Sequence, residues 1–158
     1  MWPTWALPCL IMGATLCAME LVATLVHRHV MHRAGWAWHK SHHEAHKNVF
    51  EKNDLYAVVF AAISIALFVA GGFIPALWWI GLGMVAYGLL YALLHDVLVH
   101  RRIPFPRQPR SGYLKRLVQA HRLHHAVHER EGAVSFGFLY APPVAKLVSE
   151  LRANAKPR

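Results

Sequence analysis

The sequence predicts an all-α integral membrane protein in which three transmembrane helices carry histidine-rich helices on their cytoplasmic side. Three observations support this fold class. The chain of 158 residues is 56% hydrophobic with a mean hydropathy of +0.27, yet its formal net charge is +9. Lys and Arg are absent from two long apolar stretches, and the chain contains 13 histidines. At this length we expect a single domain, residues 1–158.

The basic residues lie in two blocks. Residues 2–27 and 53–100 contain no Lys or Arg, and all 17 basic residues fall in 28–52 or 101–158. Each block begins where an apolar stretch ends, which is the pattern that the positive-inside rule produces on the cytoplasmic flanks of spanning helices. Strong basicity is also typical of nucleic-acid-binding proteins, but nucleic-acid binding would not explain the apolar stretches. We therefore expect a multi-pass membrane protein without a nucleic-acid partner.

The first apolar stretch, residues 3–26, is predicted to be a retained spanning helix. It lacks the basic segment that precedes the apolar part of a signal peptide, because the first cation is Arg28. One acid, Glu20, interrupts it. A carboxylate within a span is costly and usually functional.

The second apolar stretch is too long for one span. Residues 55–94 contain no Asp, Glu, Lys or Arg. About 40 residues correspond to about 60 Å of helix, twice the hydrocarbon thickness of about 30 Å. Gly71, Gly72 and Pro75 lie in the middle, where the chain can turn. We expect a hairpin of two helices, at 54–73 and 76–95.

The chain after His95 is then expected on the cytoplasmic side, with the N-terminus outside. Residues 113–128 have the periodicity of an amphipathic helix with cations between the apolar positions. Residues 134–143 are apolar, but about ten residues are too few for a span, which needs about 20. This stretch is expected to lie in the interface, to re-enter the membrane as a short fourth element, or to pack against the hairpin.

Ten histidines form four clusters. An H-x4-H pair is followed by an H-x2-H-H cluster, and this order occurs twice along the chain. All lie at or beyond the cytoplasmic ends of the predicted spans. On a helix, positions i, i+3 and i+4 share a face and adjacent positions diverge by about 100°. Each H-x2-H-H cluster therefore directs three rings to one side and splays the last two toward neighbouring metal ions. The two histidines of each H-x4-H pair can face the same site if the helix bends or ends between them. The ten are His27, His32, His39, His42, His43, His95, His100, His121, His124 and His125.

Ten imidazoles are too many for one ion and suit two ions, each with a position open for dioxygen or water. Imidazole binds iron, zinc, copper and nickel alike, so the ligand type leaves the metal open. The sequence lacks the Glu-x-x-His motifs of carboxylate-bridged bundles. No catalytic residue is expected beyond the ligands. The other histidines, His29, His46 and His128, are interpreted as interfacial polar residues.

Acids beside the clusters are candidates to orient the ligands, because a metal-bound imidazole usually donates its other N–H to a carboxylate. Glu44, Asp54 and Asp96 adjoin clusters. Glu20 lies seven residues before His27 and so on the same helical face. Asp54 also has a structural interpretation as the N-cap of the second span.

The histidine pattern resembles that of the membrane fatty acid hydroxylase/sterol desaturase superfamily. Within it, the chain is similar to bacterial carotenoid 3-hydroxylases over residues 20–151. Four segments carry this narrower resemblance: Asn-Asp-Leu-Tyr-Ala-Val-Val-Phe at 53–60, Tyr-Leu-Lys-Arg at 113–116, His-Arg-Leu-His-His-Ala at 121–126 and Val-Ser-Phe-Gly-Phe-Leu-Tyr-Ala-Pro-Pro at 134–143.

The resemblance implies a non-haem di-iron monooxygenase of the bacterial inner membrane that uses dioxygen to hydroxylate C3 of a β-ionone ring. β-Carotene would pass through β-cryptoxanthin to zeaxanthin, and canthaxanthin would be a further substrate that gives astaxanthin. All ten clustered histidines match the family's ligands to two iron ions, with zinc as an alternative occupant. A ferredoxin-type protein would supply electrons, and the bilayer would supply the substrate. Candidates to line the substrate groove are Phe136, Phe138, Leu139 and Tyr140.

Two other functions are consistent with the residues. A sterol or acyl-lipid hydroxylase or desaturase of the same superfamily would share the histidines and differ in its lipid groove. A non-enzymatic metal-binding or metal-transporting membrane protein would also collect histidines. Transport favours ligands along a path across the bilayer, whereas these clusters are predicted on one side.

Overall fold

The computed structural model describes residues 4–44, 48, 50–104 and 107–155, and within these ranges it contains helices and no strand. The predicted all-α fold class is confirmed. The elements in chain order are α1 (Ala6–Val26), the π-helix η1 (His27–Ala34), α2 (Trp36–His43), α3 (Asp54–Gly71), α4 (Pro75–Tyr91), the π-helix η2 (Ala92–Val99), α5 (Gly112–His124) and α6 (Val144–Asn154).

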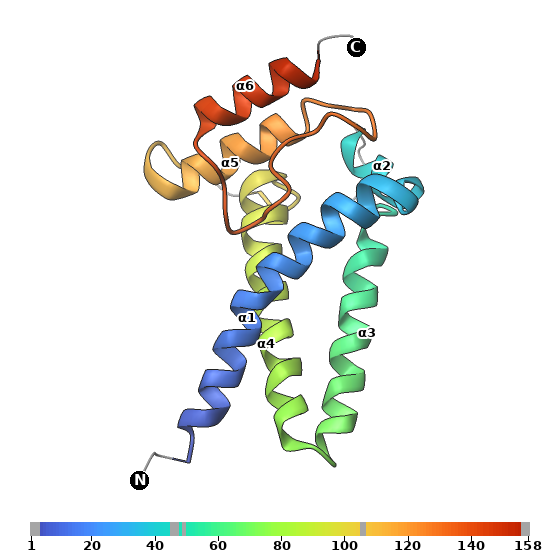
Figure 1. The fold of residues 1–158 in the computed structure, drawn as a ribbon, viewed down its shortest axis with the longest axis vertical. Helices are drawn as coiled ribbons and strands as arrows, with labels where there is room; N and C mark the ends of the chain where they lie inside the picture. Colours follow the sequence, from blue (N-terminus) through green and yellow to red (C-terminus); the bar gives the residue numbers. More distant parts are fainter. Residues whose placement is uncertain (1–3, 45–47, 49, 105–106, 156–158) are drawn as a thin grey trace.

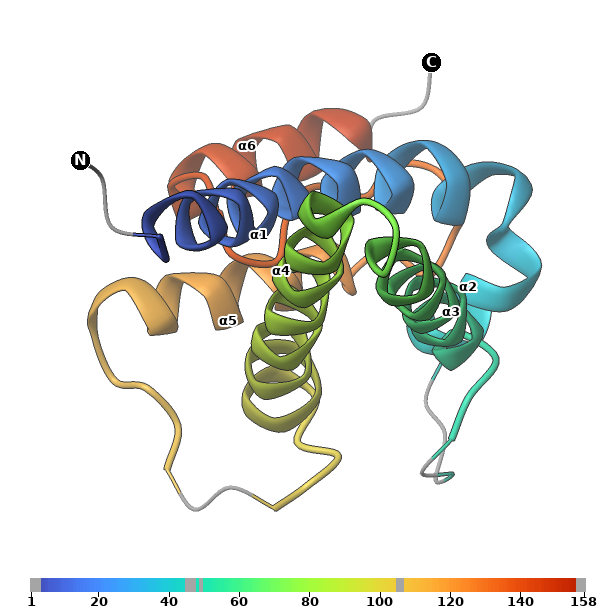
Figure 2. The same cartoon turned by 90° about the horizontal axis from the view of Figure 1, so that it is seen from below.

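Three helices are long and apolar enough to cross a membrane: Ala6–Ala34, Asp54–Gly71 and Pro75–Val99. Figures 1 and 2 show them as a bundle in which α1 and α3 each pack against α4. The three predicted spans are therefore present. The first was expected to begin at residue 3, which lies outside the described residues, and the helix itself begins at Ala6.

The predicted hairpin in the second apolar stretch is confirmed, since α3 ends at Gly71 and α4 begins at Pro75. Proline is favoured at the start of a helix because the N–H that it lacks would have no partner there. Small residues let the helices approach closely. A Cβ on Gly71 would lie 2.7 Å from the Cβ of Trp78, and a Cβ on Gly83 would lie 2.7 Å from the carbonyl oxygen of Met12 in α1.

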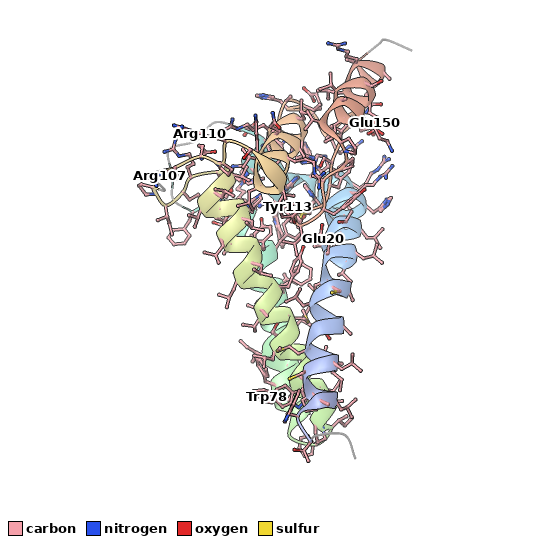
Figure 3. The ribbon with its side chains drawn as sticks, turned by 90° about the vertical axis from the view of Figure 1, so that its left-hand side faces the viewer. Glu20, Trp78, Arg107, Arg110, Tyr113 and Glu150 are labelled. Carbon is pink, nitrogen blue, oxygen red and sulfur yellow. The ribbon has the colours of Figure 1, made fainter. Side chains whose placement is uncertain are left out.

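The remaining helices form an end layer. In Figure 1, α2, α5 and α6 surround the C-terminal ends of α1 and α4, opposite the N-terminus and the α3–α4 turn. Figure 3 places Trp78 at that opposite end. α5 ends at His124 rather than at the predicted residue 128. The chain turns away there, and the carbonyl oxygen of Val127 accepts a hydrogen bond from Nδ1 of His43 at 2.8 Å.

Residues 134–143 form an irregular loop rather than a fourth membrane helix. The loop leaves the end layer and dips toward α1 and α4 (Figure 1). Its backbone amides donate hydrogen bonds to Glu20 of α1. A Cβ on Gly137 would lie 2.8 Å from Oε1 of Glu20, so only glycine allows this close approach. The loop also contacts the predicted hairpin, because Phe138 packs against Tyr91 of α4 with ring centroids 4.8 Å apart.

Candidate metal centre

The ten clustered histidines converge where the end layer covers α1 and α4. Eight are buried, and His100 and His125 are half-buried. Their ligand nitrogens form two groups, each with its atoms within 4.8 Å of one another. Site A contains His27, His32, His39, His43 and His124, and site B contains His42, His100, His121 and His125. His95 borders site B, because its Nε2 atom lies 2.9 Å from Nε2 of His42.

The two π-helices explain the H-x4-H pairs. Residues five apart differ by about 140° on an α-helix, but an i→i+5 hydrogen bond closes a wider turn that brings them onto one side. The N–H of His100 donates to the carbonyl of His95 at 2.9 Å, and the N–H of Gly35 donates to the carbonyl of Val30 at 2.8 Å. The first of these helices then breaks, with non-helical dihedral angles at His32 and Arg33. The sequence predicted a bend or end at these pairs but not the π-helical turns.

The adjacent histidines of the H-x2-H-H clusters are divided between the two sites. His43 lies in site A and His42 in site B, and likewise His124 lies in site A and His125 in site B. Splayed neighbours on α2 and α5 therefore hold the two sites next to each other.

The Nδ1 atoms of seven histidines face oxygen acceptors at 2.7–2.9 Å. The acceptors are the carbonyl oxygens of Phe136 for His27, Arg130 for His32, Val127 for His43 and Val134 for His124, and the side chains of Asn53 for His39, Glu51 for His42 and Asp96 for His95. Because a carbonyl or carboxylate oxygen only accepts, each Nδ1 carries the proton. Each Nε2 therefore presents a lone pair to the centre of its site.

These lone pairs face one another at short distances. The Nε2–Nε2 distances are 3.1 Å for His27–His39, 3.2 Å for His32–His124 and for His39–His43, and 2.9 Å for His42–His95. In site B, the Nε2 atoms of His100 and His125 also lie 3.0 and 2.9 Å from Nε2 of His121. Two lone pairs repel unless a cation lies between them. With a metal–nitrogen distance of about 2.1 Å, ligands at right angles lie about 3.0 Å apart and tetrahedral ligands about 3.4 Å apart. Both sites therefore fit metal ions with near-90° ligand angles.

The electrostatics of α2 favour the neutral imidazoles that metal binding requires. Burial, together with a smaller effect of the neighbouring imidazole of His32, lowers the pKa of His39 to about 3 and the pKa of His43 to about 4. Burial also lowers the pKa of His42 well below its ordinary value. At neutral pH these rings are uncharged.

Of the four acids expected to orient the ligands, Asp96 contacts a clustered histidine, His95, at 2.8 Å. Glu44 is exposed and pairs with Lys40 at 3.3 Å. Asp54 accepts a hydrogen bond from the backbone N–H of Glu51 at 3.0 Å and one from Arg102 at 2.7 Å. The alternative interpretation of Asp54 as the N-cap of the second span is wrong, because Asn53 holds that position and Asp54 is the first residue of α3.

Glu20, the fourth of these acids, binds the 134–143 loop and does not orient a histidine directly. Its carboxylate accepts the backbone N–H groups of Phe138, Leu139 and Tyr140 at 2.9–3.0 Å and the Tyr87 hydroxyl at 2.8 Å. In Figure 3, Glu20 lies close to the loop and to Tyr113 of α5, whose hydroxyl donates to the carbonyl of Leu139. Through this loop Glu20 acts indirectly on site A, since the loop supplies the carbonyl acceptors of His27 and His124.

Glu51 and Asn53 were not identified as candidates from the sequence. Nδ1 of His42 lies 2.7 Å from Glu51, whose side chain is 2% exposed, and Nδ1 of His39 lies 2.7 Å from the Asn53 side-chain oxygen. Arg102 contacts the carboxylates of Glu51, Asp54 and Asp96. Glu51 and Asn53 lie directly before the second span, and Asn53 begins the segment 53–60 that carries the family resemblance. Their position was the available sequence signal for a role at the site.

An apolar cavity of about 320 Å³ lies among α1, α3 and α4. Tyr91 and Phe138 line it. Tyr91 stacks on His95 with ring centroids 4.4 Å apart, and Phe138 stacks on His27 at 5.1 Å. Small residues on α3 and α4 widen the cavity: Ala57, Ala61, Ser64 and Gly88.

Of the four residues predicted to form a substrate groove, Phe138 alone is among the residues that line this cavity. Phe136 packs against the rings of His27, His32 and His124 on the other side of site A. Leu139 packs against the buried cluster of Met19, Ala23 and Tyr87. Tyr140 is 66% exposed.

Comparisons with known proteins agree with this geometry. The chain matches the Fatty acid hydroxylase family over residues 12–142. It is 59% identical over 151 residues to a beta-carotene hydroxylase of Pantoea ananas, covering 94% of this chain and 85% of the relative. It is also 59% identical over 147 residues to a beta-carotene hydroxylase of Paracoccus sp. (strain PC1), covering 92% and 91%.

A more distant relative is the chloroplastic beta-carotene 3-hydroxylase of Haematococcus lacustris, 38% identical over 142 residues, which cover 84% of this chain and 42% of the relative. No solved structure matches the chain. The family match covers most of the chain, and the two bacterial relatives are matched over 85% and 91% of their own length. The chain belongs to the fatty acid hydroxylase family, together with the bacterial beta-carotene hydroxylases.

Proposed function

We propose that this membrane protein hydroxylates C3 of the β-ionone ring of carotenoids as a di-iron monooxygenase, with residues 1–158 acting as one domain. The observation that carries the proposal is the apolar cavity between the spanning helices, whose wall includes rings stacked on the histidines of the two sites. The ten histidines would hold two iron ions, which supply the activation of dioxygen that insertion into a C–H bond requires.

The protein's own residues would bind and orient the substrate. Tyr91 and Phe138 connect the cavity to His95 and His27, so a ring placed there lies beside both sites. The cavity is at the level of the spanning helices, and a lipid-soluble substrate reaches it laterally. The protein needs to enclose one ring, while the rigid polyene stays in the bilayer, which suits a chain with three spans.

The direct test is expression in cells that accumulate β-carotene, with pigment analysis. We expect zeaxanthin, with β-cryptoxanthin as the intermediate, when oxygen and iron are supplied. The relatives named beta-carotene hydroxylase support this substrate over sterols and acyl lipids. Unchanged β-carotene in well-expressed, aerated, iron-replete cells would contradict the carotenoid assignment and favour the sterol or acyl-lipid alternative.

Filling the cavity should impair hydroxylation without unfolding the protein. Gly88 lines the cavity, and an added Cβ there meets nothing within 4 Å. The substitution Gly88→Leu should therefore occupy substrate space and lower kcat/KM for β-carotene by about tenfold or more, since a single methylene in an apolar pocket already changes kcat/KM by about 10- to 200-fold. Gly13→Leu is the matched control, because Gly13 is exposed on α1 and its added Cβ also meets nothing. Equal activity of the two variants would contradict this placement of the substrate.

The end layer is proposed to face the cytoplasm, with the protein in the bacterial inner membrane. The basis is that every Lys and Arg belongs to 28–52 or 101–158, outside the two apolar stretches. A reporter fused in the α3–α4 turn should be found outside, and a reporter fused after Arg107 should be found inside. The reverse pattern would place the metal centre on the periplasmic side.

Hydroxylation with dioxygen converts R–H, O₂, two electrons and two protons into R–OH and water, and the electrons need a donor. We propose an acidic, ferredoxin-type donor, because a polar cavity lined by arginines reaches His32 of site A. This cavity, of about 610 Å³, suits its docking. Arg28, Arg33 and Arg130 line this cavity together with His32 of site A. A positive surface steers a negative partner and places it close to the metal centre.

Reversing charge at this cavity should weaken donor binding. The double variant Arg33→Glu/Arg130→Glu should raise the KM for a plant-type ferredoxin by about tenfold and reduce the salt dependence of the rate. A single turnover after chemical reduction should be unchanged. Arg107→Glu/Arg110→Glu is the control, since Figure 3 places both residues at the far edge of the end layer. Equal effects of the two double variants would indicate a non-specific charge effect and contradict docking at His32.

A further inference from the structure

Sites A and B differ in the groups behind their rings. In site A, each acceptor of an Nδ1 proton is neutral: the backbone carbonyls of Phe136, Arg130, Val127 and Val134, and the side-chain oxygen of Asn53. At site B, His42 donates to the carboxylate of Glu51 at 2.7 Å, and His95 on its border donates to that of Asp96 at 2.8 Å. An imidazole that donates to a carboxylate is the more basic and therefore the stronger ligand.

The charged residues around the two sites also favour a cation at site B over one at site A. Beside site B, one guanidinium, Arg102, contacts three carboxylates, so this four-residue cluster has an excess of negative charge. Beside site A, the polar cavity that reaches His32 is lined by Arg28, Arg33 and Arg130 against a single acid, Glu131. Coulomb interactions therefore stabilise an added cation at site B and disfavour one at site A.

We propose that the two metal positions are unequal: site B, completed by His95, binds a divalent ion more tightly and fills first, and Glu51 and Asp96 produce the difference. Site A is then the position that exchanges its metal ion. This inference rests on the proposed dimetal centre and goes beyond it, because the ten-histidine pattern repeats the same order of spacings twice and gives no reason for the positions to differ. Glu51 and Asp96 are positioning residues, since they act through His42 and His95.

Metal titration of the chelator-treated protein in lipid nanodiscs tests the proposal without relying on activity. Zn²⁺ binding followed by calorimetry and elemental analysis should show two classes of one ion each, with Kd values that differ by at least about tenfold, the lower end of the effect of groups that orient metal ligands. His100→Ala should remove the tight class and leave the weak one. His32→Ala should remove the weak class and leave the tight one. In each variant the surviving class shows that the protein is folded.

The double variant Glu51→Gln/Asp96→Asn keeps an oxygen acceptor at both positions but removes its charge. It should weaken the tight class by about 10- to 100-fold and leave the weak class unchanged. Glu44→Gln is the control, because Glu44 is an exposed acid paired with Lys40, and it should change neither class.

Two indistinguishable positions in the unmodified protein would overturn this proposal alone. So would loss of the weak class in His100→Ala, which would reverse the assignment. A tight class that survives the Glu51→Gln/Asp96→Asn substitution intact would show that the carboxylates do not produce the difference. A protein that binds no metal ion at all would instead overturn the proposed dimetal function.

Discussion

Replacing His39 with alanine is expected to abolish carotenoid hydroxylation and to lower the metal content of the protein. His39 is 2% exposed, and its Nε2 atom lies 3.1 Å from that of His27 and 3.2 Å from that of His43. The substitution removes one lone pair from the centre of site A. Because groups that merely orient a ligand affect metal affinity or activity by about 10- to 100-fold, loss of the ligand itself should exceed that range. Zeaxanthin formation and elemental analysis measure the two effects.

The controls are histidines of the same chain. His29 and His128 are exposed, and their replacement by alanine should leave activity unchanged. His46, which lies outside the described residues, is expected from its spacing to be equally tolerant. Asn53→Ala should give an intermediate loss of about 10- to 100-fold, because it removes the acceptor behind His39 but not the ligand. Full activity after loss of several clustered histidines would refute the dimetal centre.

The spans and the histidine sites could be predicted because both depend on local spacing. Apolar length and the positions of charge determine how often the chain crosses the bilayer. The 100° step of an α-helix determines that His42 and His43 point to different histidine sites. The intervals of five residues in the His27–His32 and His95–His100 pairs do not fit that step, and they were the local sign of the two π-helical turns.

Apart from Asp96 beside His95, the groups behind the histidines were not predicted, and three of them come from distant parts of the chain. His27 donates to a carbonyl 109 residues away and His32 to one 98 residues away. Every residue has a backbone carbonyl, so the sequence does not indicate which carbonyl accepts the hydrogen bond. The cavity was missed for another reason: small apolar residues such as Ala57 and Gly88 face lipid or a cavity equally well in a membrane helix, so the aromatic loop at 136–140 was favoured instead.

Replacing Glu20 with alanine should disable the enzyme although Glu20 touches no clustered histidine. Its carboxylate accepts three backbone N–H groups of the 134–143 loop and the Tyr87 hydroxyl. Each buried donor left without a partner costs about 1–3 kcal/mol, so the loop should detach from α1. The Nδ1–H groups of His27 and His124 would then lose their acceptors, the carbonyls of Phe136 and Val134. We expect at least about a tenfold loss of activity and weaker metal binding at site A.

Graded variants separate this positioning role from a general loss of stability. Tyr87→Phe removes one of four hydrogen bonds and should have a small effect. Glu20→Gln keeps one acceptor oxygen and should be intermediate, and Glu150→Ala, an exposed acid on α6 (Figure 3), should have none. The readouts are zinc affinity at each site and the ratio of β-cryptoxanthin to zeaxanthin. Because Phe138 also lines the cavity, a detached loop should raise KM as well as lower kcat. A Glu20→Ala protein with unchanged metal affinity at site A and unchanged KM would show that the loop does not depend on this carboxylate.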